Sequence, residues 1–181
     1  MSLPHPDWSD PITENGPEPM LAWLSDQFHD LADEGQEVVN RYWQELRMLE
    51  NSHSSYQRST LGLRMRLREN LAVSLEWYLM GTLGRSKKPV AKVHIAKGRT
   101  HDAYSLKVLM RRQPVWLTDH VDGIEKELTQ IRMRQTRLIR IRDALGDLLK
   151  ITTGSHATGS QLMAHYIARE SYRPLSGGEA H

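Results

Sequence analysis

Hydrophobic residues recur every three, four or seven positions over the first long stretch of the chain, which is the period of one face of an α-helix. The stretch begins at Pro19, where a first-turn proline is tolerated, and ends near Asn51. Acidic residues line the opposite side of this helix. Gly35 falls on the apolar face, where the lack of a side chain would allow another helix to cross closely. The apolar stripe consists of Leu21, Leu24, Phe28, Leu31, Val38, Tyr42, Leu46 and Leu49.

A second helical pattern starts at Pro114 and is the most regular in the chain. Its apolar positions follow a near-heptad spacing, and acidic residues early in the stretch suit the positive end of a helix dipole. Two such seams of similar length predict an antiparallel helix pair or a dimer through the same seam, and the pattern leaves both alternatives open. The seam, of the kind found in coiled coils, consists of Leu117, Val121, Ile124, Leu128, Ile131, Gln135, Leu138, Leu145 and Leu149.

Between Leu61 and Ile95 the hydrophobic period drops to two, which is typical of half-buried strands. We expect strands at 63–67 and 71–79, joined by a hairpin at Arg68-Glu69-Asn70, and a third strand from Val90 to Ile95. The apolar side of such a sheet needs a cover, which the helices supply. The predicted fold is therefore α+β, with two long amphipathic helices packed against a small three-stranded antiparallel sheet.

The chain divides into three predicted parts. Residues 1–17 contain four prolines and are expected to form a flexible arm, residues 18–151 a single α+β domain, and residues 152–181 a C-terminal tail with a short helix from Ser160 to Glu170. Another short helix is expected from Asp102 to Arg112. Four tryptophans fall on or beside apolar faces, so core packing is expected for Trp23, Trp43, Trp77 and Trp116, while Trp8 in the arm would be free to stack on something else.

Composition narrows the class of protein. Hydrophobic residues make up 39% of the chain and charged residues 25%, as in ordinary globular proteins. No apolar run approaches the roughly 18 residues that span a bilayer, and the N-terminus lacks a basic region followed by an apolar one. The absence of cysteine favours a reducing compartment. We therefore expect a cytoplasmic protein with no membrane contact.

Catalytic patterns are missing from the sequence. The nine histidines include no H-E-x-x-H pair, and only His94 and His101 flank one turn where they could share a metal. Nucleophile-elbow and phosphate-loop motifs lack their glycines, and the sheet region holds few carboxylates. We accordingly expect no enzyme, no cofactor, no metal site and no catalytic residue.

Charge is sorted along the chain more strongly than its net value of +2 suggests. Residues 1–54 carry a net charge of −9 and residues 55–181 a net charge of +11. A helical wheel places basic residues opposite the second seam, and strand alternation places others on the outer face of the sheet and in the following loop. Guanidinium groups match phosphate oxygens, so these are candidate DNA contacts: Arg64, Arg66, Arg68, Arg85, Lys87, Lys88, Lys92, Lys97, Lys126, Arg132, Arg137 and Arg140.

A structural explanation of the same residues has similar weight. Arginines on a helix can simply keep it soluble, particularly where Glu125 and Glu127 pair with neighbours at helical spacing. Alternating arginines on a hairpin also block edge-to-edge aggregation of sheets.

Short motifs over residues 60–150 resemble the MobI-type conjugative transfer proteins. They are SLEWYLM ending at Met80, VHIAKG at 93–98, Tyr104, and EKELTQIRMRQTRL from Glu125 to Leu138. The resemblance implies a role in initiating DNA transfer at the origin of transfer, beside a relaxase, on integrative conjugative elements and large plasmids. It supplies no catalytic residue, and its matching positions are Trp77, Lys97, Tyr104 and Arg132.

Two hypotheses follow. The first is a non-catalytic accessory protein of conjugative transfer that binds double-stranded DNA and works with a relaxase or another transfer protein, with the acidic first helix turned towards a protein partner. The second is a helical interaction or dimerisation module of a mobile genetic element, without direct DNA contact.

Overall fold

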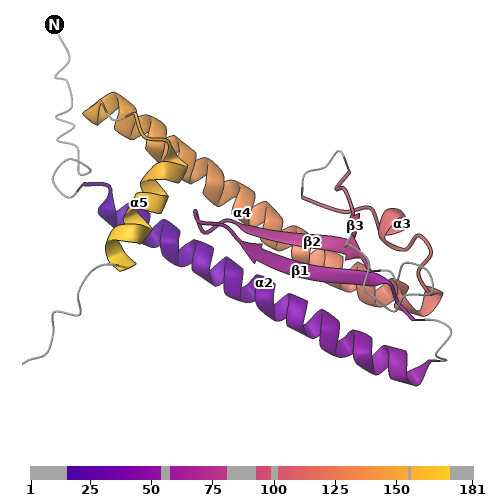
Figure 1. Cartoon of the computed structure of the whole chain (residues 1–181). Helices are drawn as coiled ribbons and strands as arrows, with labels where there is room; N and C mark the ends of the chain where they lie inside the picture. Colours follow the sequence, from indigo (N-terminus) through magenta and orange to yellow (C-terminus); the bar gives the residue numbers. More distant parts are fainter. Residues whose placement is uncertain (1–15, 54–57, 81–92, 99–101, 155, 172–181) are drawn as a thin grey trace, which may run out of the picture.

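A computed structural model of the chain describes residues 16–53, 58–80, 93–98, 102–154 and 156–171. Its longest elements are helices α2 (Glu18–Ser52) and α4 (Thr118–Thr153), which lie side by side and run in opposite directions (Figure 1). Ion pairs from Glu34 to Arg134 and from Arg41 to Glu127 record this antiparallel register. Of the two alternatives left open by the sequence, the structure shows the antiparallel pair within one chain.

A three-stranded antiparallel sheet lies across one side of the helix pair (Figure 1). Its strands are β1 (Leu61–Leu67), β2 (Val73–Leu79) and β3 (Val93–His94), with β2 in the centre. The predicted α+β fold is thus confirmed. The second strand starts two residues later than expected because Leu71, at φ 62°, has a left-handed conformation that an extended strand does not allow. The third strand was predicted from Val90, and residues 90–92 lie outside the described residues.

The core forms where the apolar face of the sheet meets both helices. Phe28, Tyr42 and Trp77 are fully buried there. The Tyr42 hydroxyl donates to the carbonyl of Leu61 (2.7 Å), and this bond ties α2 to β1. Gly35 serves the sheet and not the expected helix crossing, because a Cβ at this position would lie 3.2 Å from the Leu75 side chain.

The segment between the sheet and α4 is less helical than predicted. Helix α3 covers only Leu106–Leu109, and a single 3-10 turn, η1 (Val115–Leu117), leads into α4. Arg112 has φ 64°, which interrupts any continuous helix up to the proline at 114.

The predicted C-terminal helix is present as α5 (Gly159–Ser171), which crosses α4 and α2 at one end of the pair (Figure 1). Helix α4 ends at Gly154, whose φ of 69° is the left-handed conformation that glycine adopts without strain. Gly146 and Gly159 then let the two backbones touch, since a Cβ on Gly146 would lie 2.5 Å from the Gly159 nitrogen. The crossing therefore depends on two glycines.

The tryptophans divide into two groups. Trp77 is fully buried and Trp43 and Trp116 pack against the core, as expected. Trp23 is 46% exposed, so the expectation that it belongs to the core is wrong. Trp8 lies outside the described residues.

Candidate nucleic-acid interface

Strand β2 has an edge that β3 covers over only a short distance, and side chains of α4 bond three of the backbone groups along the rest of it. The Gln135 side chain accepts from the Val73 N–H (2.7 Å) and donates to the Val73 carbonyl (2.9 Å). Arg132 donates to the carbonyl of Leu75 (3.3 Å), and the N–H of Ile95 donates to the carbonyl of Trp77 (3.2 Å). A buried backbone N–H or carbonyl without a hydrogen-bond partner costs free energy. The face of α4 that lies against this edge therefore carries polar side chains although it is buried.

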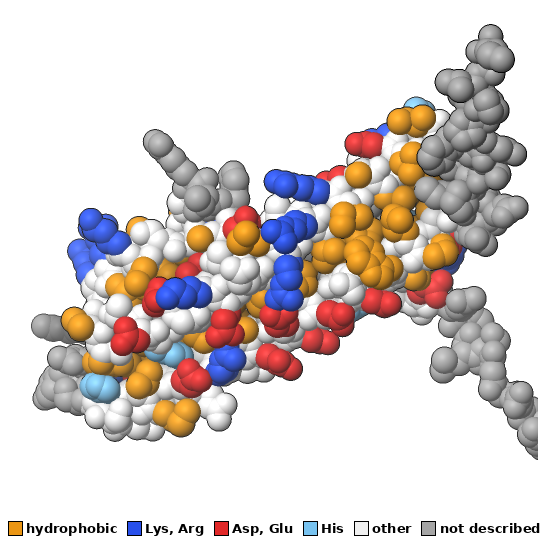
Figure 2. All heavy atoms as spheres, turned by 180° about the vertical axis from the view of Figure 1, so that it is seen from behind, with side chains coloured by type: hydrophobic (Ala, Val, Ile, Leu, Met, Phe, Trp, Pro, Cys, Tyr) orange, Lys and Arg blue, Asp and Glu red, His pale blue; other side chains and the backbone are white. Residues whose placement is uncertain are grey.

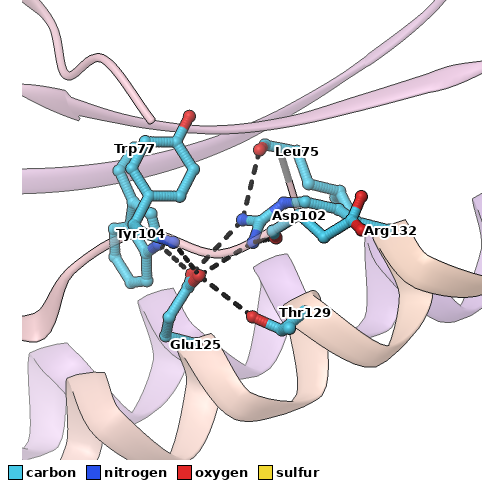
Figure 3. A network of polar contacts seen from close by, with 7 residues as sticks. All are labelled: Leu75, Trp77, Asp102, Tyr104, Glu125, Thr129 and Arg132. Atoms are coloured by element: carbon cyan, nitrogen blue, oxygen red, sulfur yellow. Dashed lines mark hydrogen bonds and ion pairs between the residues drawn. The ribbon is translucent and has the colours of Figure 1, made fainter. Parts of the chain in front are cut away.

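Glu125 is the centre of the polar network on this face (Figure 3). The carboxylate is buried and accepts hydrogen bonds from the Trp77 indole N–H (2.6 Å), the Tyr104 backbone N–H (2.7 Å) and the Thr129 hydroxyl (3.1 Å). It also forms an ion pair with Arg132 at 2.8 Å. Both oxygens of the buried carboxylate therefore have several donors, as the removal of a charge from water requires.

Arg132 is only 4% exposed, so its predicted place in an exposed DNA-binding stripe is wrong. Its guanidinium donates to Glu125, to the Asp102 carbonyl (2.8 Å) and to the Leu75 carbonyl, and lies 4.9 Å from the centre of the Tyr104 ring. The helical wheel placed Arg132 opposite the seam that faces α2. The structure covers that side of the helix with the sheet and residues 102–104.

The four positions that match the family resemblance meet in this region. Trp77 and Arg132 share Glu125 with the backbone of Tyr104, and the Lys97 ammonium lies 5.8 Å from the centre of the Tyr104 ring. Loss of hydration lowers the pKa of Lys97, and the neighbouring Arg132 cation lowers it further. Burial likewise raises the pKa of the Tyr104 hydroxyl.

A hollow of about 660 Å³ opens beside this network, between the sheet, residues 94–97 and 102–104, and α4. Arg68 and Lys97 lie on its wall together with the buried Arg132 and Arg142, against the carboxylates of Glu76 and Asp102. Glu76 is occupied by Arg64, with a distance of 2.6 Å between Arg64 Nη2 and Glu76 Oε2. Arg132 is paired with Glu125 and Arg142 with Asp143. Among the lining residues, Arg68 and Lys97 therefore remain to attract an anion.

The outer face of the hairpin continues this positive surface. Strand register places Arg64 opposite Glu76 and Arg66 opposite Ser74, and Arg68 follows at the turn. Arg66 and Arg68 are exposed, and Arg68 donates to the Ser74 hydroxyl (3.2 Å). Arg64 is thus neutralised across the strands by Glu76, whereas Arg66 and Arg68 have no ion-pair partner among the described residues, and Glu69 is exposed beside them in the turn.

The predicted cations of α4 that remain exposed lie on a different side of the molecule. At about 100° per residue, Arg137 and Arg140 point well away from Gln135, which contacts the sheet. Neither has an ion-pair partner among the described residues, whereas Lys126 pairs with Asp122 at 2.6 Å. The structure therefore separates the predicted cations into a sheet surface (Arg64, Arg66, Arg68 and Lys97) and a helix surface (Lys126, Arg137 and Arg140).

Four predicted contacts, Arg85, Lys87, Lys88 and Lys92, lie outside the described residues. Among the residues that are described, no cluster of three or more histidine, aspartate or glutamate side chains could hold a metal ion. No helix in the described ranges is long and apolar enough to cross a membrane.

Sequence reasoning did not find the importance of Glu125 or Arg142. Glu125 was expected to pair with a neighbour one turn away, but its partner is seven residues along the helix, two turns away on the same face. Arg142 is 5% exposed and pairs with Asp143 at 2.9 Å. For Glu125 the sequence did contain a signal: an opposite charge, Arg132, lies seven residues along the same helix face. Hydrophobicity alone marks this face as exposed.

Comparison with known proteins agrees with the resemblance. A family model described as MobI protein matches residues 31–146, more than half of the chain, and this span includes Glu125, Arg132 and the whole sheet. Neither the curated proteins nor the solved structures contain a match. The chain therefore belongs to the MobI family, whose members are mobilisation-related proteins of conjugation.

Proposed function

We propose that this protein is a non-catalytic accessory factor that binds duplex DNA at the origin of transfer and assists a relaxase in starting conjugative transfer. The main support is the sheet surface, where Arg66 and Arg68 are exposed without carboxylate partners among the described residues. Membership of the MobI family gives this surface a biological setting.

The sheet surface suits a phosphate backbone in shape and charge. Strand alternation places Arg64, Arg66 and Arg68 on one face, about 7 Å apart along the strand, which is close to the spacing of phosphates along one DNA strand. Arginine can contact phosphate oxygens through two parallel N–H groups. The hollow beside Arg68 provides one further exposed cation, Lys97, for an adjacent phosphate.

The buried network would support this surface without touching DNA. Arg132 and Gln135 fix the free edge of β2, and β2 carries Glu76, which orients Arg64. Among the described residues, no nucleophile and general base in the hollow are arranged in a way that requires a reaction. We therefore assign the protein a role in binding and positioning DNA and no reaction.

The proposal can be tested by fluorescence anisotropy with labelled duplexes, one carrying the origin of transfer and one unrelated. We expect affinity to fall steeply as salt rises, because each neutralised phosphate releases counterions. The double variant Arg66→Gln, Arg68→Gln should weaken binding to both duplexes and reduce the salt slope by about 0.9 for each phosphate that is no longer neutralised. A matched control is Arg47→Gln, Arg111→Gln, which removes two exposed arginines outside both basic surfaces.

The helix surface is tested separately with Arg137→Gln, Arg140→Gln. Reduced affinity in this variant would add α4 to the DNA contact, and unchanged affinity would restrict the contact to the sheet. If the wild-type chain shows no salt-dependent binding at micromolar concentration, the DNA-binding function is wrong and the protein-interaction module without DNA contact replaces it. Co-purification of a relaxase from transfer-competent cells tests the second part of the proposal.

A further inference from the structure

An exposed apolar patch covers the helix pair on the side opposite the sheet, towards the end where α5 crosses. It contains two side chains of α2, with Met20 44% and Trp23 46% exposed, and three of α4, with Ile141 41%, Leu148 38% and Ile151 84% exposed. Figure 2 shows hydrophobic side chains gathered on this face. Monomeric proteins seldom expose so many large apolar side chains together unless the surface has a partner.

The patch begins where the polar contacts between the helices end. Along this rim, Glu45 meets His120, Arg41 meets Glu127 and Glu34 meets Arg134. The heptad step that connects His120, Glu127 and Arg134 on α4 reaches Ile141 and Leu148 next. One half of this rim is therefore polar and largely solvent-exposed, and the half that contains Ile141 and Leu148 is apolar and suited to contact with a partner.

Charges on the two sides of the patch have opposite sign. Asp26 and Asp30 are exposed on α2, and Arg137 and Arg140 are exposed on α4. In the register set by Glu34 and Arg134, Asp30 lies level with residue 138 and Asp26 with residue 142. Figure 2 shows this division as a row of acidic side chains along α2 and basic side chains on the neighbouring helix.

From this arrangement we infer that the patch binds a second copy of the chain, forming a dimer whose two-fold axis runs parallel to the helices. This operation places α2 of each copy over α4 of the other at the same level along the axis. Trp23 and Leu148 then meet apolar side chains of the partner, and Asp30 faces Arg137 twice. An axis across the helices would place acidic α2 on acidic α2, which charge repulsion disfavours.

In this dimer the two helix pairs form a four-helix bundle, and the two sheets lie on its outer sides. If the proposed DNA contact is correct, the two sheet surfaces face away from each other, so one dimer would hold two separate DNA segments. The dimer itself does not rest on the DNA-binding proposal, because its residues lie on a different side of the molecule from the sheet surface, and of the helix surface it uses only Arg137.

Sedimentation equilibrium of the full chain after nuclease treatment tests the inference. We expect a dimer at tens of micromolar, and the charge-reversed variants Asp30→Arg and Arg137→Asp should each be monomeric because the reversal places like charges together twice in a homodimer. Mixing the two variants should restore a dimer, since each then meets an opposite charge on the other. Glu69→Arg, an equal reversal on the exposed hairpin turn, is the matched control and should stay dimeric.

Leu148→Glu gives an independent reading, because Leu148 is part-exposed and its replacement should dissociate the dimer while circular dichroism stays unchanged. A wild-type chain that is monomeric at these concentrations would overturn the inference, and would point to another segment or another protein as the cover of the patch. Variants that remain dimeric when reversed singly would also overturn it. DNA binding is measured on the same samples, so failure of one proposal is visible without the other.

Discussion

The sharpest test of the buried network is the replacement of Arg132 by glutamine. The native guanidinium pairs with Glu125 and donates to two backbone carbonyls in a site where both side chains are less than 10% exposed. In Arg132→Gln, the buried carboxylate keeps neutral donors from Trp77, Tyr104 and Thr129 but has no cation. Breaking one side of a buried ion pair typically costs about 3–5 kcal/mol, and we expect a decrease of that size in the free energy of unfolding.

This decrease is large compared with the total stability of an ordinary domain, which is about 5–15 kcal/mol. It is measured by urea denaturation followed by far-ultraviolet circular dichroism, with Arg140→Gln as the matched control. The control makes the same substitution on the same helix at an exposed position, so its effect should stay within about 0.5 kcal/mol.

A double-mutant cycle separates the ion pair from the rest of the network. Glu125→Gln alone leaves a buried cation without its counter-charge, and it should be about as costly as Arg132→Gln. The double variant removes both charges, so it should be less destabilised than the sum of the two single variants. If Arg132→Gln matches the stability of Arg140→Gln, the Arg132 side chain is exposed in solution and the buried network is refuted.

Three further features of the structure can be tested in the same way. The pKa of Lys97 is lowered by burial and by Arg132, so Lys97 loses its charge at a lower pH than in the unfolded chain. DNA affinity should therefore decrease as the pH rises towards 10.5. Lys97→Met should remove this part of the pH dependence in anisotropy titrations. Gly146→Ala and Gly159→Ala would force apart the α4–α5 crossing at about 1–3 kcal/mol each, and hydrogen exchange should show α5 losing protection before the sheet does. The exposed pair of Glu34 and Arg134 should contribute at most about 1 kcal/mol, so Arg134→Gln should barely shift the urea midpoint, and a larger shift would mean that the rim is more buried than the structure shows.

Several features of the fold follow directly from local sequence. The helical period fixed both long helices to within a few residues of Glu18–Ser52 and Thr118–Thr153, because amphipathic spacing over many turns has few other solutions. Alternation likewise identified the first two strands, since their apolar positions must face one side. The sorting of charge and the resemblance of short motifs to the MobI family were also readable without any structure.

The candidate site depends on which polar residues are buried, and periodicity does not contain that information. Arg137 and Arg140 are exposed as expected. Arg132 is enclosed because, in the described part of the chain, β3 pairs with only two residues of β2, and the β2 backbone takes further partners from α4. A helical wheel identifies only the apolar face, whereas this helix has two covered faces, one packed on α2 and one on the edge of the sheet.

The reverse holds for Trp23, which sequence places in the core although it is 46% exposed. Its position on α2 is compatible with either outcome, and the choice depends on where α4 and α5 end and which part of the helix pair they leave uncovered. Sequence alone determined the elements, their apolar faces and the sign of the charge on each half of the chain. Only the tertiary structure decided which charges are buried together and which apolar side chains are exposed, because both depend on contacts between segments far apart in the chain.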